Sequence, residues 1–153
     1  MSAQDLRKAR EKCYRLLAAR SRTEQELRHR LADAGFAGDV TDEIILELKH
    51  KNLLNDEAYA GNWVRWRLTV KPVGREYLRK ELKYKGIGSE IIDSVLIDYD
   101  HERELQNALT LARQRLERER GITWRRLAAF LHRRGFSTEI VAAVYRLLVE
   151  VER

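Results

Sequence analysis

The chain contains few residues that would restrain its backbone. Only one cysteine, Cys13, and one proline, Pro72, occur among its 153 residues. A single cysteine excludes an internal disulfide and fits a reducing cytoplasm. A single proline leaves almost the whole chain able to be helical, and no sustained alternation of apolar and polar residues predicts a strand. We therefore expect an all-α protein.

Long apolar segments are also absent. No apolar run approaches the roughly 20 residues of a membrane span, and the first residues lack the apolar core of a signal peptide. A hydrophobic content of 44% with 35% charged residues is typical of a charge-rich helical protein and not of a disordered chain. We expect a cytoplasmic protein with no membrane partner.

The sequence also lacks the common motifs of catalytic and metal-binding sites. The histidines His29, His50, His101 and His132 are scattered, and no two have the i, i+4 spacing of a metal-binding helix. The sequence has no glycine-rich phosphate loop and no Gly-x-Ser-x-Gly motif. We therefore expect a protein that is not an enzyme and that uses no metal or cofactor.

One motif, in contrast, is used three times. Each copy has two leucines four residues apart, a glycine four residues later and then an apolar residue. The copies are Leu27-x3-Leu31-x3-Gly35-Phe36, Leu78-x3-Leu82-x3-Gly86-Ile87 and Leu127-x3-Leu131-x3-Gly135-Phe136. A period of about 50 residues marks a repeat protein, whose units stack to bury faces that none could bury alone. Such a protein offers an extended binding surface and not an enzyme pocket.

The motif predicts a helix that ends in a tight corner. Leucines four apart share one helix face, and a glycine just after the helix suits left-handed backbone. With Gly35 at C′, Leu31 and Phe36 fall at C3 and C″, the two positions that touch in a Schellman cap. A second helix follows each corner. Candidate N-caps, for these helices and for the first leucine helix, are Ser21, Thr23, Ser89, Ser137 and Thr138.

Apolar spacing along the chain predicts nine helices in three groups of three. For four of these helices the sequence predicts both the first and the last residue: they span residues 5–20, 41–51, 56–70 and 102–120. We expect three tandem three-helix repeats, at residues 1–53, 54–101 and 102–153, which stack into an elongated, curved array.

The net charge of +6 is unevenly distributed. Six basic residues stand between residues 71 and 86 and eight between residues 113 and 134, whereas residues 87–104 carry six acidic ones. In a stacked repeat this alternation predicts charged stripes that can face phosphates or an acidic protein. A mixed-charge surface that only contacts solvent is the open alternative. The predicted binding stripe consists of Arg65, Arg67, Arg75, Arg79, Lys80, Lys83, Lys85, Arg125, Arg126, Arg133 and Arg134.

Three tryptophans stand near arginines in the sequence. Trp63, Trp66 and Trp124 could stack on the bases of a single-stranded nucleic acid. Packing in the core is the favoured alternative for Trp63, and for the other two both interpretations stay open. A helix-turn-helix reader of DNA sequence is a weaker hypothesis. The basic residues here precede the corner, whereas such a reader places its contacts on the helix after it.

Four longer signatures occur in order along the chain. They are Leu17-x2-Arg20-x2-Thr23-x2-Glu26-Leu27-x3-Leu31-x3-Gly35-Phe36, Leu53-Leu54-Asn55-Asp56-x2-Tyr59-Ala60, Leu78-x3-Leu82-x2-Lys85-Gly86-Ile87 and Leu131-x2-Arg134-Gly135-Phe136. At this spacing they resemble the RecX family of regulators of the bacterial RecA recombinase, over nearly the whole chain. Two turns depart from the family pattern. Asn52 stands where glycine is frequent, and Lys71-Pro72-Val73-Gly74 replaces a Gly-aromatic-Gly-Pro segment.

The resemblance implies a non-enzymatic protein that lies along a RecA–DNA filament and inhibits ATP hydrolysis and strand exchange. The implied partners are the RecA filament and single-stranded DNA, with double-stranded DNA as a further candidate. We expect a monomer. The alternative hypothesis is a general DNA-binding helical module that acts independently of RecA.

Overall fold

The computed structural model describes residues 2–152, and this part of the chain is entirely helical and turn. The helices are α1 (Ala3–Ala19), α2 (Glu24–Asp33), α3 (Gly38–His50), α4 (Asp56–Val70), α5 (Arg75–Tyr84), α6 (Ser89–Val95), α7 (His101–Arg118), α8 (Trp124–Arg133) and α9 (Thr138–Glu152). The all-α prediction and the nine helices are confirmed within the described residues. One predicted start is wrong by three residues, because α3 begins at Gly38 and not at Thr41.

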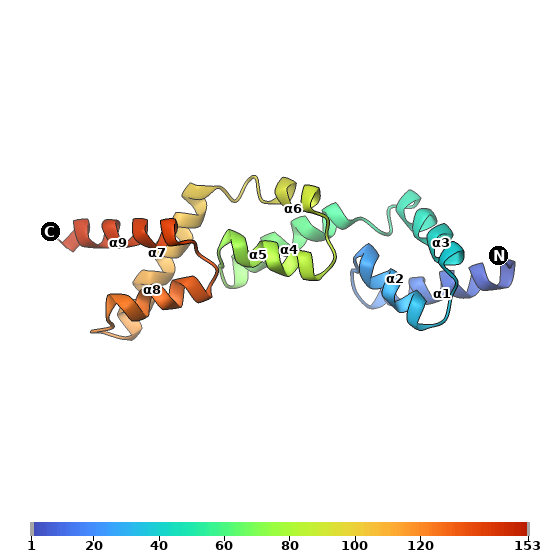
Figure 1. Ribbon diagram of the computed structural model, residues 1–153, viewed down its shortest axis with the longest axis horizontal. Coiled ribbons are helices and arrows are strands. Elements are labelled where there is room, and N and C mark those ends of the chain that lie inside the picture. The colour runs from blue at the N-terminus through green and yellow to red at the C-terminus, as the bar shows by residue number, and fades with distance from the viewer. Residues whose placement is uncertain (1, 153) are drawn as a thin grey trace.

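The helices form three groups of three, placed in a row (Figure 1). Contacts between helices fall mainly within a group, so that α1 and α2 pack with α3, α4 and α5 with α6, and α7 and α8 with α9. The two ends of the chain lie at opposite ends of the row, and α2, α5 and α8 follow one another along its lower edge in Figure 1. The array is therefore elongated, as the repeated motif predicts.

Each group buries its own hydrophobic cluster. The first cluster centres on Ala9, Cys13, Leu27, Leu31, Ile44 and Leu48; the second on Ala60, Val64, Leu78, Leu82, Ile92 and Leu96; and the third on Ala108, Ala112, Leu127, Leu131, Ile140 and Val144. Both leucines of every motif copy are almost completely buried. Each such side chain contributes about 1.5–3 kcal/mol when it leaves water. The division at residues 53 and 101 remains a prediction, since Leu54 packs with the first cluster.

The three corners are Schellman caps, as predicted. At the first corner Phe36 donates its N–H to the Leu31 carbonyl over 3.1 Å, and Gly35 donates to Ala32 over 2.9 Å. The same pair of bonds closes the other two corners. Gly35, Gly86 and Gly135 have φ of +88°, +87° and +84°, a region that a Cβ atom disfavours. The corner geometry therefore follows from the glycine of the motif.

The predicted N-caps are confirmed in part. Thr23 Oγ1 accepts from the Glu26 N–H over 3.2 Å, and Ser137 Oγ accepts from the Ile140 N–H over 3.2 Å. The prediction for Ser89 is wrong, because Gly88 holds the N-cap position and Ser89 is the first helical residue. Asn52, where the family pattern favours glycine, has φ of +57° and so replaces glycine at a left-handed helix end.

Neighbouring groups are joined through the ends of α2, α5 and α8. The Thr23 hydroxyl, before α2, donates to the Lys85 carbonyl at the end of α5 over 2.7 Å. The Gly74 N–H, before α5, donates to the Arg134 carbonyl at the end of α8 over 2.7 Å. The C-terminus of one helix thus faces the N-terminus of another, an arrangement that aligned helix dipoles favour. We call each of these two contacts a joint.

A carboxylate completes each joint. The Glu24 N–H, in the first turn of α2, donates to Asp56 Oδ1 of α4 over 2.9 Å. The Arg75 N–H, in the first turn of α5, donates to Glu104 Oε2 of α7 over 2.8 Å. Burial raises the pKa of both carboxyl groups, although the donated N–H opposes this shift. The two joints therefore use the same chemistry at the same places in the repeat.

Candidate nucleic-acid interface

A cationic pocket lies where the second and third groups meet. Its volume is about 270 Å³, and it is lined by Arg67, Lys71, Val73, Tyr77, Phe130, Arg133 and Arg134. The second joint brings these residues together, because the α8 end that carries Arg133 and Arg134 abuts the start of α5. Four cations thus surround two aromatic rings. We refer to this site as the cationic pocket.

Arginines stack on both rings. The Arg67 guanidinium carbon lies 5.2 Å from the centre of the Tyr77 ring. On Phe130, the guanidinium carbons of Arg115 and Arg134 lie 5.0 and 5.3 Å from the ring centre. Such cation–π contacts hold a guanidinium in place while leaving its N–H groups available. Arg67 also donates to Glu81 Oε1 over 2.9 Å, which fixes its orientation.

Arg134 is the least compensated cation in the pocket. Burial lowers the pKa of its guanidinium, and the positive charges of Arg67, Arg115 and Arg118 lower it further. Its Nη1 atom is buried and has no hydrogen-bond partner among the described residues. A buried donor without a partner costs about 1–3 kcal/mol. An anion in the pocket would relieve the repulsion between these guanidiniums, so the pocket suits a phosphate group.

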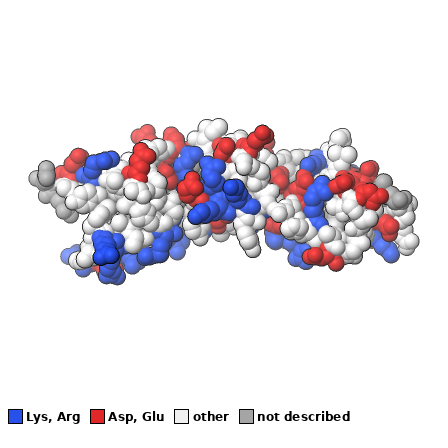
Figure 2. All heavy atoms as spheres, viewed as in Figure 1, with Lys and Arg blue, Asp and Glu red and all other residues white. Residues whose placement is uncertain are grey.

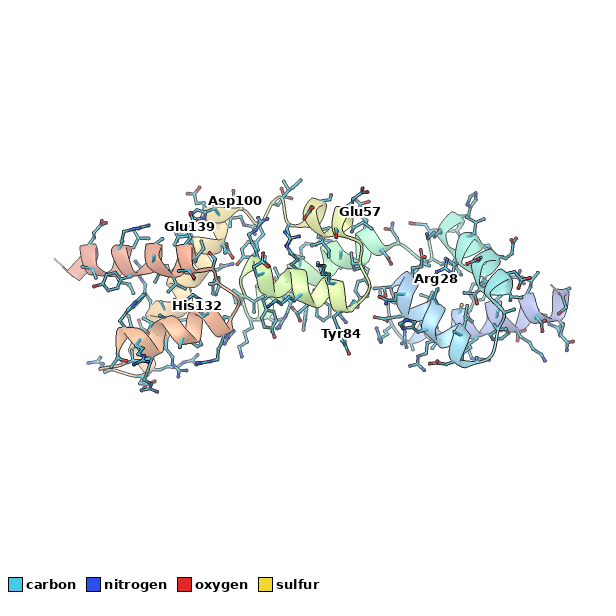
Figure 3. The ribbon with its side chains drawn as sticks, viewed as in Figure 1. Arg28, Glu57, Tyr84, Asp100, His132 and Glu139 are labelled. Carbon is cyan, nitrogen blue, oxygen red and sulfur yellow. The ribbon has the colours of Figure 1, made fainter. Side chains whose placement is uncertain are left out.

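The basic surface continues along the same edge of the molecule. Lys80 and Lys83 on α5 and Arg125 on α8 are exposed, and none forms a salt bridge within residues 2–152. Figure 2 shows basic residues along the lower edge of the third group, and acidic ones along the upper edge of the second and third groups. Tyr84 projects from the lower edge with 91% of its surface exposed (Figure 3). An exposed aromatic between cations is suited to stacking on a base.

The tryptophans divide between core and surface. Trp63 is half-buried and packs against the second hydrophobic cluster, which confirms the predicted core role. Lys85 Nζ lies 4.3 Å from its ring centre. Trp66 lies 5.2 Å from Trp63 between ring centres and is 51% exposed. Trp124 packs against the third cluster and against Tyr145. Trp66 is therefore the tryptophan most accessible to a base.

Three residues of the predicted stripe have their charge engaged elsewhere, and a fourth lies on another face of its helix. Arg75 donates to the carbonyls of Leu96 and Tyr99 over 3.1 and 2.6 Å. Arg79 pairs with Asp93 over 2.7 Å, and Arg126 pairs with Glu119. Arg65 lies on a different face of α4 from Arg67, since two residues turn a helix by roughly 200°. The structure thus gathers Arg67, Arg133 and Arg134 and separates these four from them.

Three residues that line the pocket, and two arginines close to it, were not selected from the sequence. The lining residues are Lys71, Tyr77 and Phe130, and the nearby arginines are Arg115 and Arg118. Lys71, Arg115 and Arg118 stand in the two basic stretches, so charge counting could have found them. Tyr77 and Phe130 have no local signal, because only the joint brings α5 and α8 together.

An open groove of opposite charge lies over α4, α6 and the start of α7. Its volume is about 1140 Å³, and its acidic lining residues are Glu57, Asp98, Asp100 and Glu102. Figure 3 places Glu57 and Asp100 on the upper edge, opposite Tyr84. Arg65 lines this groove and not the cationic pocket. The second and third groups therefore have a basic edge and an acidic edge.

Within residues 2–152 no group of three or more His, Cys, Asp or Glu side chains is placed to hold a metal ion. No described helix is both long enough and apolar enough to cross a bilayer.

Comparison with known proteins matches this architecture. Residues 9–48 match the family model of the first three-helix domain of RecX, and residues 55–96 match that of the second. The regulatory protein RecX of Mycolicibacterium smegmatis is 36% identical over 150 residues, which cover 92% of this chain and 79% of that protein. RecX of Mycobacterium leprae is 38% identical over 146 residues, covering 92% of this chain and 85% of that protein.

A solved structure agrees along the full array. The crystal structure of RecX from Lactobacillus salivarius superposes with a TM-score of 0.88 at 26% identity, and the match covers 96% of this chain and 98% of that one. The similarity thus includes the third group of helices, which neither family model spans. From the two domain matches and the identity over most of its length, we conclude that the chain belongs to the RecX family of regulatory proteins.

Proposed function

We propose that this protein binds the RecA–single-stranded-DNA filament and inhibits its ATP hydrolysis and strand exchange. The observation that carries the proposal is the cationic pocket of this RecX-family rod, in which Arg67 is paired with Glu81 but Arg133 and Arg134 have no salt bridge within residues 2–152. In this proposal a DNA backbone phosphate pairs with Arg134 and Arg133, and the acidic edge faces the protein part of the filament.

An elongated array suits such a target. Its three groups can touch successive subunits of a helical filament, and contacts that are individually weak gain from their high effective concentration. Occupation of the filament in this way would exclude a second DNA duplex from strand exchange. No step of the proposed function requires catalysis by this chain.

The test is a RecA-dependent ATPase assay on single-stranded DNA. Stoichiometric wild-type protein should inhibit hydrolysis, and the double variant K71E/R133E should lose most of that inhibition. Both substitutions reverse exposed charges at the pocket, so helical content should stay unchanged in circular dichroism. R65E is the matched control, because it reverses an arginine on the other face of α4. Absence of inhibition by the wild type would refute the proposal.

A general DNA-binding module remains the second candidate, favoured by the number of exposed cations on the basic edge. About six phosphate contacts would make affinity fall about a thousandfold or more between roughly 50 and 200 mM salt. Inhibition of RecA that persists at salt where binding to bare DNA is lost would exclude this candidate. Inhibition that disappears in step with DNA binding would support it.

A further inference from the structure

Each repeat carries two halves of a joint. One half accepts, and consists of a carboxylate on the first helix, the carbonyl that ends the second helix and the glycine after it. The other half donates, and consists of the residue before the second helix and the first N–H of that helix. The three carboxylates are Asp5, Asp56 and Glu104, each four residues before the buried alanine of its helix (Ala9, Ala60 and Ala108).

Three repeats have six halves in total, and the two joints within the chain pair four of them. The donor half of the first repeat meets the acceptor half of the second through Thr23 and Glu24. The donor half of the second repeat meets the acceptor half of the third through Gly74 and Arg75. Two halves are left over: the acceptor half of the first repeat and the donor half of the third.

The leftover acceptor half is uncovered. Asp5 is exposed and has no salt bridge within the described chain. A Cβ atom built on Gly35 would meet nothing within 4 Å, whereas one on Gly86 would strike Gln25 and one on Gly135 would strike Tyr77. The glycine that the joints cover in the other two repeats is therefore bare in the first.

The leftover donor half is built like the one that Thr23 provides. Thr123 Oγ1 accepts from the Arg126 N–H over 3.3 Å, as Thr23 Oγ1 accepts from Glu26 over 3.2 Å. The Thr23 hydroxyl also donates a hydrogen bond to the Lys85 carbonyl. Thr123 is exposed, and among residues 2–152 its hydroxyl has no acceptor of that kind. Arg125 beside it and Asp5 at the other end also make the two halves complementary in charge.

We propose that copies of this chain associate end to end by forming the same joint between them. The Thr123 hydroxyl of one copy donates to the Ala34 carbonyl of the next, and its Trp124 N–H donates to Asp5. The interface is an extension of the joints within the chain. Because the two halves differ and lie at opposite ends, the contact does not close on itself and builds an open row of copies. This inference goes beyond the proposed function, requires neither DNA nor RecA, and stands against the monomer expected from the sequence.

Two single variants block one half each without removing a helix cap. Gly35→Asn adds a side chain where the joint needs none, and Asn52 shows that asparagine is accepted at a left-handed helix end in this chain. Thr123→Asp still accepts the Arg126 N–H, since aspartate is a good N-cap. It has no hydroxyl hydrogen and faces the Asp5 carboxylate of the next copy. Thr138→Asp, at the first residue of α9, is the charge-matched control.

Sedimentation velocity over a range of concentrations is the test. For the wild type and Thr138→Asp, the average mass should rise from 18.0 kDa without stopping at a dimer. Gly35→Asn and Thr123→Asp alone should associate at least tenfold more weakly. Their equimolar mixture should form a dimer and stop there, because one intact acceptor half meets one intact donor half.

Small-angle X-ray scattering supplies the second measurement. The longest dimension should grow with concentration while the cross-section stays constant. A wild type that remains a monomer up to about millimolar concentration would overturn the proposal. So would a mixture in which the two variants stay monomeric while the wild type associates. If Gly35→Asn fails to fold, Asp5→Lys replaces it as the variant of the acceptor half.

Discussion

Gly74 donates its backbone N–H to the carbonyl oxygen of Arg134 over 2.7 Å. The residue whose guanidinium lines the cationic pocket therefore also closes the joint between the second and third repeats through its main chain. The position of the pocket depends on this bond, because the bond brings the end of α8 against the start of α5. Joint and pocket can be separated experimentally, since one uses the backbone of Arg134 and the other its side chain.

Gly74 should tolerate no larger residue, although its φ of −75° is ordinary. A Cβ atom there would strike the backbone of Gly135 and Phe136, and overpacking of this kind costs about 1–3 kcal/mol. Gly74→Ala should therefore lower the free energy of unfolding by that amount in urea titration. Gly88→Ala is the matched control, because Gly88 also precedes a helix and its Cβ would meet nothing within 4 Å. An equal loss in the two variants would contradict the role of the joint.

Gly86 combines a conformational and a steric requirement. Gly86→Ala and Gly121→Ala both place a side chain at positive φ, +87° and +84°, which costs about 1–3 kcal/mol. Only at Gly86 would the new Cβ also strike Gln25. We expect Gly86→Ala to be the more destabilising by about 1 kcal/mol or more. Gln25→Ala in the same chain should recover part of this difference in thermal unfolding, and no recovery would argue against the contact.

Glu104 should make stability depend on pH in the direction opposite to most carboxylates. Burial raises the pKa of Glu104, so just above its unfolded value of about 4.3 the folded chain binds more protons than the unfolded chain. Stability from this group therefore falls as pH rises through that window. The Glu24 carboxylate acts in the opposite direction. Hydrogen bonds and charge from Lys49 and Arg28 lower its pKa despite burial, so the stability it provides is lost as pH falls.

Glu104→Gln tests this assignment. The amide oxygen can still accept the Arg75 N–H but carries no charge to desolvate. The variant should be more stable than the wild type at pH 7 in urea titration, and its advantage should shrink as the pH is lowered towards about 4.3. Glu102→Gln, an exposed position on the same turn of α7, should show no such trend. An advantage that is constant across pH would count against the raised pKa.

Arg134→Met should separate stability from binding. Methionine keeps the contact with Phe130 and removes the like charge that opposes Arg67, so the free energy of unfolding should rise by about 1 kcal/mol. The Arg134 carbonyl, which closes the joint, is unaffected. If a phosphate pairs with this side chain, affinity for single-stranded DNA should fall and the slope of log K against log salt should decrease by about one. Arg65→Met serves as control and should leave the slope unchanged.

The corners could be predicted because their cause is local. One glycine with a leucine before it and an apolar residue after it specifies a Schellman cap, and this pattern occurs three times in the sequence. The buried leucines of each group followed from the same pattern. Even Asn52, a departure from the family pattern, fits a left-handed end for a reason contained in its own side chain.

The cationic pocket could not be predicted, because it depends on joints that leave little trace in the sequence. The hydrogen bond from Gly74 to Arg134 joins two main-chain atoms, so no side chain in the sequence indicates it. Without the joint, Tyr77 and Phe130 have no reason to lie together. Arg65 and Arg67 are only two residues apart in the sequence, but they lie on opposite faces of α4. Arg65 therefore lines the acidic groove and Arg67 the cationic pocket. The spacing of Asp56 and Glu104 before a buried alanine has no meaning in the sequence alone, because their acceptor role depends on the joints.

The joints also impose an order on assembly. The first turn of α2 finds its acceptors on Asp56 and Lys85, and that of α5 finds them on Glu104 and Arg134. The first and second groups thus each depend on acceptors that lie later in the chain. Since ribosomes build from the N-terminus, the Thr23 hydroxyl before α2 has no Lys85 carbonyl to donate to until Lys85 has been translated. Docking of the groups should then proceed in the same direction as synthesis, and a chain that stalls midway would display an unmatched donor end.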